Sequence, residues 1–124
     1  MVDDDIPTNF INQRIIESTG LDVHIQVCES GIEALEYLKK EDQQLQPSLI
    51  FLDINMPGMN GWEFLDEFEK IPAEDRSNII VSMLSTSINP DDKRKAQERT
   101  SVETFFSKPL KSEYLDLLMK KHFT

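Results

Sequence analysis

The sequence predicts an α/β domain in which a doubly wound parallel sheet is covered by helices on both faces. Short apolar runs alternate with stretches of helical spacing along all 124 residues, which is typical of strand–helix–strand units. Successive residues in these runs are apolar without alternation, as expected of parallel strands that are buried on both faces. Right-handed crossovers then place helices on both sides of the sheet. We expect residues 1–124 to form one domain, since this length is near the commonest domain size.

Four apolar runs are predicted to be strands, and a fifth strand is predicted to be a stump. Only Met1 and Val2 precede an acidic run at the amino end, so the first strand is expected to be truncated. A short first strand leaves buried backbone groups of its neighbours without partners, which costs free energy. The four complete predicted strands are Asp22–Cys28, Ser48–Asp53, Asn78–Leu84 and Val102–Ser107.

Five segments are predicted to be helices, four from apolar residues at helical spacing and one from a capping signal alone. Ser30 with Glu33, and Asn60 with Glu63, have the spacing of capping boxes. Pro90 directly follows an asparagine, and proline is favoured at the first position of a helix. The predicted helices are Pro7–Ser18, Gly31–Lys40, Gly61–Lys70, Pro90–Arg99 and Ser112–Lys121.

The composition narrows the classes of function. The chain has 23 acidic and 13 basic residues and a formal net charge of -10, which argues against direct binding to nucleic acid. This charge fits a bound cation or a partner protein with a positive patch, although solubility accounts for much of it. The single cysteine, Cys28, cannot form an internal disulfide and is expected in the core. Without a signal peptide or a membrane-length apolar run, a cytoplasmic location with no membrane contact is expected.

Polar side chains follow four of the predicted strands. Because the carboxyl ends of parallel strands meet at one edge of the sheet, where open α/β folds bind their ligands, we expect these side chains to lie together. Asp53 is the most informative of them, since four apolar residues precede it and a loop rich in proline and glycine follows it. The strand ends are Asp3-Asp4-Asp5, Asp53, Ser85-Thr86-Ser87 and Lys108-Pro109.

This set of residue types favours phosphoryl chemistry. Clustered carboxylates repel one another and raise one another's pKa, and a hard divalent cation relieves the repulsion. Mg²⁺ prefers oxygen ligands and often binds one or two carboxylates together with phosphate oxygens. A lysine and a hydroxyl on the opposite side suit the remaining phosphoryl oxygens. The predicted reaction is phosphoryl transfer to an aspartate, which forms an acyl phosphate.

Five motifs, in this order and at this spacing, resemble the receiver domain of two-component response regulators. The resemblance covers essentially the whole chain except the start of the first strand. It implies a flavodoxin-like sheet of five parallel strands in the order 2-1-3-4-5, an order for which a receiver protein is a standard example. The matching motifs are Val2–Asp5, Gly31–Leu35, Leu52–Gly61, Ser85–Ser87 and Lys108–Leu110.

The resemblance implies a phosphoacceptor and a Mg²⁺ site. Asp53 stands at the phosphoacceptor position and would also be a metal ligand. Asp4 corresponds to the direct Mg²⁺ ligand, and Asp3 to a residue that acts largely through water. Asn55, two residues after Asp53, would offer its backbone carbonyl to the metal.

The resemblance also implies a switch. Ser85 stands where the family has a serine or threonine that meets the phosphoryl group, and Lys108 where a lysine pairs with a phosphoryl oxygen. Phe105 occupies the position of an aromatic switch residue. The bond between Lys108 and Pro109 corresponds to one that is usually cis in the family. The output face would consist of the fourth helix, the fifth strand and the fifth helix.

The implied partners are a sensor histidine kinase or a histidine phosphotransfer protein, together with an output protein that the sequence does not identify. A homodimer is a further possibility. The chain is not expected to be an enzyme in the usual sense, although it would catalyse its own phosphoryl transfer and dephosphorylation. A stand-alone receiver and one module of a longer chain both fit the sequence.

Two alternatives stay open on sequence grounds. A degenerate receiver could serve only as a protein-binding module. An aspartyl phosphohydrolase of the haloacid dehalogenase type is the other, but such enzymes carry a second aspartate two residues after the nucleophile. Asn55 occupies that position here and cannot transfer a proton. Ser85 also has a simpler interpretation as a turn serine.

Overall fold

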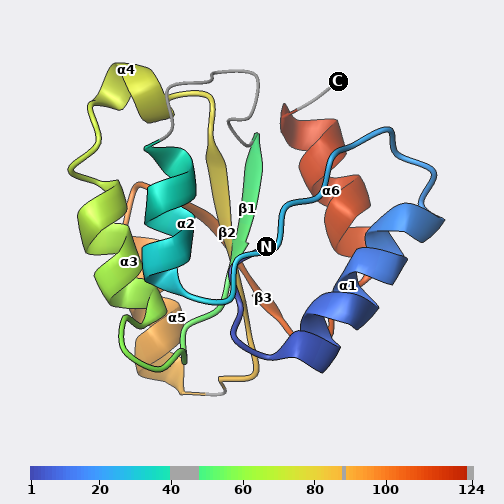
Figure 1. Ribbon diagram of the computed structural model, residues 1–124, viewed down its shortest axis with the longest axis horizontal. Coiled ribbons are helices and arrows are strands. Elements are labelled where there is room, and N and C mark those ends of the chain that lie inside the picture. The colour runs from blue at the N-terminus through green and yellow to red at the C-terminus, as the bar shows by residue number, and fades with distance from the viewer. Residues whose placement is uncertain (40–47, 88, 123–124) are drawn as a thin grey trace.

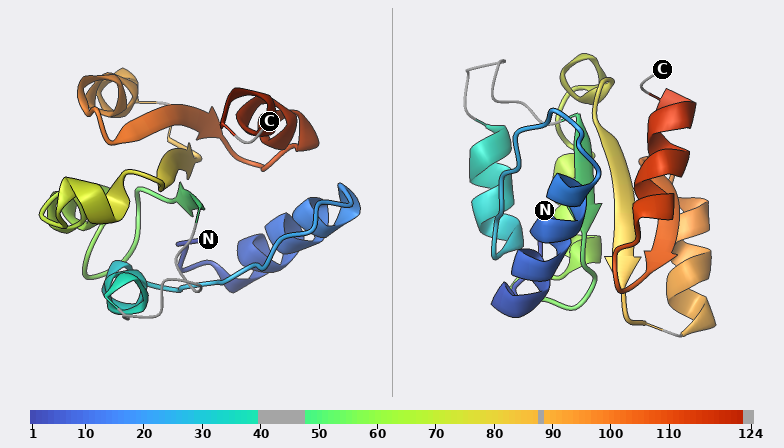
Figure 2. Two further views of the ribbon diagram at one scale, coloured as in Figure 1. Left: turned by 90° about the horizontal axis from the view of Figure 1, so that it is seen from above. Right: turned by 90° about the vertical axis from the view of Figure 1, so that its right-hand side faces the viewer.

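The computed structural model describes residues 1–39, 48–87 and 89–122. Helices cover both faces of a central parallel sheet, with α1 and α6 on one side and α2, α3 and α5 on the other (Figures 1 and 2). The elements are α1 (Ile6–Ser18), α2 (Gly31–Leu38), β1 (Leu49–Leu52), α3 (Gly61–Phe68), α4 (Ala73–Arg76), β2 (Ile80–Ser85), α5 (Pro90–Glu98), β3 (Val102–Ser107) and α6 (Ser112–His122).

The sheet has the predicted order. Strands β1, β2 and β3 are parallel neighbours in that sequence. Val2 extends the sheet beyond β1 through isolated parallel bridges to Leu52 and to Cys28. Taken in space, Cys28, Val2, β1, β2 and β3 reproduce the order 2-1-3-4-5. The predicted doubly wound α/β class is therefore confirmed, with three full strands and two positions represented by single bridges.

The predicted strand Asp22–Cys28 is wrong for all but its last residue. Only Cys28 pairs with the sheet, and the segment from Asp22 to His24 is exposed. The physical reason is the shortness of the first strand. A strand forms only where a neighbour supplies hydrogen-bond partners, and Val2 supplies them for one residue. Cys28 is buried, as expected.

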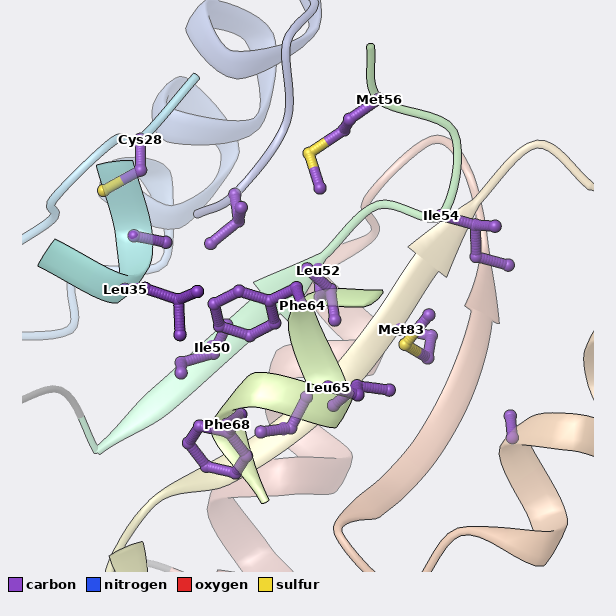
Figure 3. Packing of buried hydrophobic residues seen from close by; sticks show 14 residues of the cluster. Cys28, Leu35, Ile50, Leu52, Ile54, Met56, Phe64, Leu65, Phe68 and Met83 are labelled. Atoms are coloured by element: carbon purple, nitrogen blue, oxygen red, sulfur yellow. The ribbon is translucent and has the colours of Figure 1, made fainter. Parts of the chain in front are cut away.

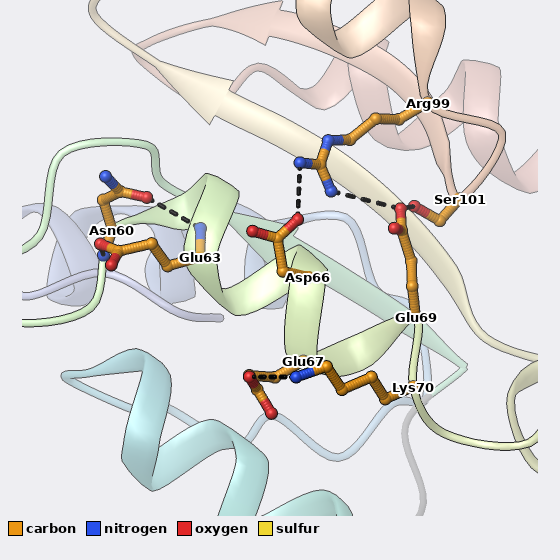
Figure 4. Close-up of polar contacts among 8 residues, drawn as sticks. All are labelled: Asn60, Glu63, Asp66, Glu67, Glu69, Lys70, Arg99 and Ser101. Carbon is orange, nitrogen blue, oxygen red and sulfur yellow. Dashed lines mark hydrogen bonds and ion pairs between the residues drawn. The ribbon is translucent and has the colours of Figure 1, made fainter.

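The helix starts follow the predicted capping signals. Asn60 and Glu63 form a full capping box, in which each side chain accepts a hydrogen bond from the other residue's backbone N–H (Figure 4). Ser30 caps α2 by accepting from the N–H of Glu33 at 3.0 Å. The Glu33 carboxylate instead accepts from the N–H of Glu29, so the second box is incomplete.

The predicted helix ends agree with the structure to within two residues wherever they are described. Lys40, the predicted end of the second helix, lies outside the described residues. The short helix α4 (Ala73–Arg76) was not predicted, because a single turn of four residues carries no periodic apolar pattern. No helix in the described ranges is both long enough and apolar enough to span a bilayer.

The core consists of two apolar clusters, one on each face of the sheet. Ile50, Leu52 and Met83 point to the side of α3, where they pack with Phe64 and its neighbours (Figure 3). Phe51 and Leu84 point to the opposite side and pack near α6. This alternation within β1 and β2 explains why both strands are apolar throughout.

A charged network joins α3 to the turn between α5 and β3. The Arg99 guanidinium lies 2.8 Å from the carboxylate of Asp66 and 3.3 Å from that of Glu69, which also accepts from the hydroxyl of Ser101 (Figure 4). The same guanidinium lies 5.7 Å from the ring centre of Trp62, a cation–π contact. Exposed ion pairs stabilise little one by one, but this group fixes α5 relative to α3.

Leu52 offers a test of the core. It is fully buried, at 0% exposure, whereas Leu117 on α6 is 53% exposed. Leu52→Ala should lower the free energy of unfolding by about 2–5 kcal/mol, because it creates a cavity beneath α3. Leu117→Ala should change it by less than about 0.5 kcal/mol. Urea denaturation measures both values, and equal effects of the two substitutions would contradict this assignment of the core.

Candidate functional site

The candidate site lies where Val2 and β1 end, side by side. The N–H of Asp53 donates to the carbonyl of Val2 at 2.9 Å, and the N–H of Asp3 donates to the carbonyl of Cys28 at 3.0 Å. These backbone bonds fix two consecutive strand ends relative to each other. As a result the side chains of Asp3 and Asp53 emerge at one edge of the sheet, as the sequence predicted.

The loop after Asp53 depends on two glycines. Gly58 adopts a φ of +79°, in the left-handed region that favours glycine. Gly61 donates its N–H to the carbonyl of Ile54 at 2.7 Å. A Cβ atom at Gly61 would lie 2.5 Å from the backbone oxygen of Asp53, so only glycine lets α3 begin this close to the site.

Three carboxylates share this edge of the sheet. Oxygen atoms of Asp3, Asp4 and Asp53 lie within 4.8 Å of one another. Asp3 and Asp53 are buried, whereas Asp4 is exposed. Three hard oxygen donors converge at a site open on one side, which matches what a hydrated divalent cation requires.

Lys108 reaches this cluster from the end of β3. Its Nζ lies 2.6 Å from Oδ2 of Asp3 and 3.5 Å from Oδ1 of Asp53. The backbone N–H of Lys108 donates to the carbonyl of Ser85 at 2.9 Å, which fixes its position beside β2. The peptide bond to Pro109 is cis, as the resemblance implied. One ammonium group therefore faces two buried carboxylates.

The pKa values reflect this crowding. Burial, together with the charge of Asp3, raises the pKa of Asp53 to about 6, although Lys108 opposes the shift. Burial alone would lower the pKa of Lys108, but the hydrogen bond and charge of Asp3 and the charge of Asp53 outweigh it and raise that pKa. The ammonium is therefore held in its charged form beside Asp53.

The remaining residues predicted for the site lie in three other places: at the end of β2, in the loop after Asp53 and on β3. The Ser85 hydroxyl is fully buried at the end of β2 and accepts a hydrogen bond from the N–H of Ser87 at 3.1 Å. Asn55 is exposed in the loop after Asp53. Phe105 is half-buried on β3 and packs against the cluster on the α3 side of the sheet. Within the described residues, no hydrogen bond joins the Ser85 hydroxyl to Asp53.

Asn9 is a positioning residue that sequence reasoning missed. It lies buried on α1, and its side-chain amide donates to the backbone carbonyl of Asp3 at 2.7 Å. The carboxylate of Asp3 also accepts from the N–H of Asp5 at 3.0 Å. The buried residues of α1 are Asn9, Asn12 and Ile16, whereas Phe10 and Ile11 are exposed, so the hydrophobic pattern of this helix gave no signal for Asn9.

Comparison with known proteins decides the family. The sequence model of the family described as "Response regulator receiver domain" matches residues 1–120. The chain belongs to this family. A two-component response regulator from Cytophaga hutchinsonii has a similar solved structure, with a TM-score of 0.89 and 39% identity over 97% of this chain and 91% of that one.

Two further relatives carry information about this receiver domain. Hybrid signal transduction histidine kinase C of Dictyostelium discoideum is 32% identical over 98% of this chain. The Mn²⁺-bound form of the response regulator Rcp1 has a TM-score of 0.75 and 25% identity, covering 99% of this chain and 92% of that one. The chain spans only part of the curated relatives that it matches. It covers 10% of the length of the Dictyostelium kinase, 63% of that of Rcp1 from Synechocystis and 15% of that of RpfC from Xanthomonas.

The raised pKa of Asp53 gives a test in metal-free receiver domain. The pKa of Asp53 in the folded state lies above the ordinary value of 3.8. The stability that this carboxyl gives to the folded state is therefore fully present below about pH 3.8 and is lost as the pH rises through about 6. The free energy of unfolding of the wild type and of Asp53→Asn is measured with a chelator present. The wild-type value minus the variant value should fall by about 2–3 kcal/mol between about pH 4 and about pH 8. A difference that is flat with pH would contradict the burial of this charge.

Proposed function

We propose that this receiver domain accepts a phosphoryl group on Asp53 from a phosphohistidine of a sensor kinase or of a histidine phosphotransfer protein. The observation that carries the proposal is the arrangement of Asp53, which lies beside two further carboxylates and 3.5 Å from the Lys108 ammonium. A nucleophilic carboxylate thus lies next to a cationic group that can pair with a phosphoryl oxygen.

The reaction would begin with attack of an Asp53 carboxylate oxygen on the phosphorus atom of phosphohistidine. The P–N bond breaks, and its electron pair stays with the imidazole nitrogen. In a separate hydrolysis step, water attacks the phosphorus atom, the bond to Asp53 breaks with its electron pair left on the carboxylate oxygen, and inorganic phosphate leaves, the water's protons passing to the phosphate or to solvent. The protein would turn over no other substrate, so it would act as a phosphorylated signalling domain rather than as an enzyme.

Lys108 would stabilise the transferred group. In the free domain its ammonium contacts both Asp3 and Asp53. Phosphorylation consumes the charge on one Asp53 oxygen and adds phosphoryl oxygens, which are strong acceptors. The ammonium lies close enough to turn to such an oxygen without leaving Asp3. It would therefore hold the phosphoryl group in one orientation.

The proposed cofactor is Mg²⁺. Asp3, Asp4 and Asp53 would hold it together with the backbone carbonyl of Asn55, and their oxygen donors fit this cation. When bound, it would neutralise the clustered carboxylates and the negative charge of the phosphoryl oxygens. The Mn²⁺-bound state of the similar protein Rcp1 supports a divalent cation in this fold.

Ser85 and Phe105 would convert phosphorylation into a structural response. The Ser85 hydroxyl would turn toward the phosphoryl group and give up its contact with Ser87. Space beside β2 would then open for the ring of Phe105, which is half-buried on the adjacent strand. The output face would comprise α5, β3 and α6. Its rearrangement would be resisted on one side by the Arg99 network that fixes α5.

The proposed partners follow from the family. Receiver domains work with histidine kinases or phosphotransfer proteins, and the similar Dictyostelium protein is a hybrid histidine kinase. We propose a protein output partner rather than nucleic acid, because the net charge of -10 opposes contact with phosphate backbones. A cytoplasmic location is proposed on the same family grounds.

Intact-mass spectrometry tests the phosphoacceptor. Incubation with Mg²⁺ and acetyl phosphate should add one phosphoryl group that is labile in base. Asp53→Asn should abolish the addition and keep the fold, because the change is nearly isosteric. Asp116→Asn, at an exposed position on α6, should label like the wild type. Full labelling of Asp53→Asn would remove Asp53 from its proposed role.

The coupling role of Ser85 has its own test. Ser85→Ala should still be phosphorylated on Asp53, but the response of α5 and β3 should shrink, because no hydroxyl is drawn to the phosphoryl group. Amide chemical shifts, recorded with and without a beryllofluoride mimic of the phosphoryl group, measure that response. Ser107→Ala, at the exposed end of the neighbouring strand, is the matched control. A complete wild-type shift pattern in Ser85→Ala would contradict the mechanism.

A further inference from the structure

Helix α5 is held to the rest of the domain largely by polar contacts at its two ends. Of its nine residues, all of which the structure describes, only Ala96 is buried. Just after its carboxyl end, Arg99 makes ion pairs with Asp66 and Glu69 at the end of α3 (Figure 4). A helix that buries so little apolar surface gains little stability from packing. The placement of α5 therefore depends on what holds its amino end.

At that amino end, a chain of hydrogen bonds runs from the end of β2 into α5. The Ser85 hydroxyl accepts from the N–H of Ser87 at 3.1 Å. The Ser87 hydroxyl lies 2.5 Å from Oδ2 of Asp92, in the first turn of α5. A carboxylate only accepts, so the hydroxyl is the donor of this bond. The same hydroxyl accepts from the N–H of Asn89, the residue that caps the helix.

The two bonds in this chain differ in strength. The N–H of Ser87 is bound to a neutral hydroxyl, whereas the Ser87 hydroxyl is bound to a carboxylate. Hydrogen bonds to an ionised partner are roughly twice as strong as neutral ones. When Ser85 turns toward a phosphoryl group, the first bond is lost and the second is kept. The half-buried N–H of Ser87 then needs a new acceptor, and a displacement of Ser87 moves Asp92 with it.

We propose that the hydrogen bond between Ser87 and Asp92 is the link through which phosphorylation of Asp53 repositions α5. This inference rests on the proposed function and adds a regulatory element to it. Ser87 and Asp92 are positioning residues, since they act through Ser85 rather than on the phosphoryl group.

This link is separate from the movement of Phe105. That ring belongs to β3, where it pairs with Met83 and packs on the α3 side of the sheet, whereas the link runs from Ser87 into α5. Loss of the Ser85 hydroxyl should therefore reduce the responses of both α5 and β3. Loss of the Ser87 hydroxyl should reduce that of α5 alone.

Amide chemical shifts of isotope-labelled protein in Mg²⁺, recorded with and without saturating beryllofluoride, test the link. In Ser87→Ala the shift response of the first turn of α5 should fall at least about threefold, because a hydrogen bond that biases two arrangements is lost. Phe105 should respond as in the wild type. Asp92→Ala should behave like Ser87→Ala, and Ser87→Thr, which keeps the hydroxyl, should restore the response.

Two controls separate a link from a merely structural role. Asp91→Ala removes an exposed carboxylate from the same turn, but Asp91 pairs with Arg94 of α5 itself at 2.9 Å, so the response should be that of the wild type. The double variant Ser85→Ala/Ser87→Ala should show the same α5 response as Ser85→Ala alone, because two steps of one chain are not additive. A structural effect of Ser87→Ala on α5 would add to that of Ser85→Ala.

A full α5 response in Ser87→Ala or Asp92→Ala would overturn the proposal, as would an equal loss in Asp91→Ala or additive losses in the double variant. Each of these results is compatible with wild-type shifts at Asp53 and Lys108, so the proposed function would stand. Absence of any beryllofluoride shift at Asp53 and Lys108 in the wild type would instead overturn the proposed function, and the link with it.

Discussion

The structure depends on the accommodation of several carboxylates at one edge of a buried sheet. Asp3 and Asp53 are buried next to each other, and Asp4 lies within reach of both. Such a group is unfavourable unless positive charge compensates it. In the free domain the compensation comes from Lys108, whose ammonium bonds Asp3 and reaches Asp53. A bound cation and a phosphoryl group would redistribute that same compensation, which links the fold directly to the proposed chemistry.

The surrounding fold holds these charges in place through backbone contacts. Val2 aligns the first strand with β1, and Gly61 lets α3 begin against the backbone of Asp53. The N–H of Lys108 is anchored to the end of β2 through the carbonyl of Ser85. Each charged side chain therefore comes from the end of a packed element rather than from a free loop. Sites built on such rigid elements keep their geometry when the charge distribution changes.

Much of this arrangement could be predicted from the sequence, because local signals and burial patterns agree there. The apolar run before Asp53, the capping box at Asn60 and the order of the strand ends all carried over to the structure. The strand predicted at Asp22–Cys28 was wrong because a strand needs a hydrogen-bonding partner. The sequence of that segment does not show how short the neighbouring first strand is. Asn9 was missed because its contact with Asp3 depends on how α1 packs, which no local pattern encodes.

The claim that the three carboxylates form one cation-binding unit can be tested by Mg²⁺ titration of isotope-labelled protein, followed through amide chemical shifts. The account predicts saturable shifts at Asp3, Asp53 and Lys108, with loss of binding in Asp4→Asn. It also predicts unchanged binding in Asp91→Asn, which alters an exposed carboxylate on α5. Shifts confined to other parts of the domain, or undiminished affinity in Asp4→Asn, would contradict it.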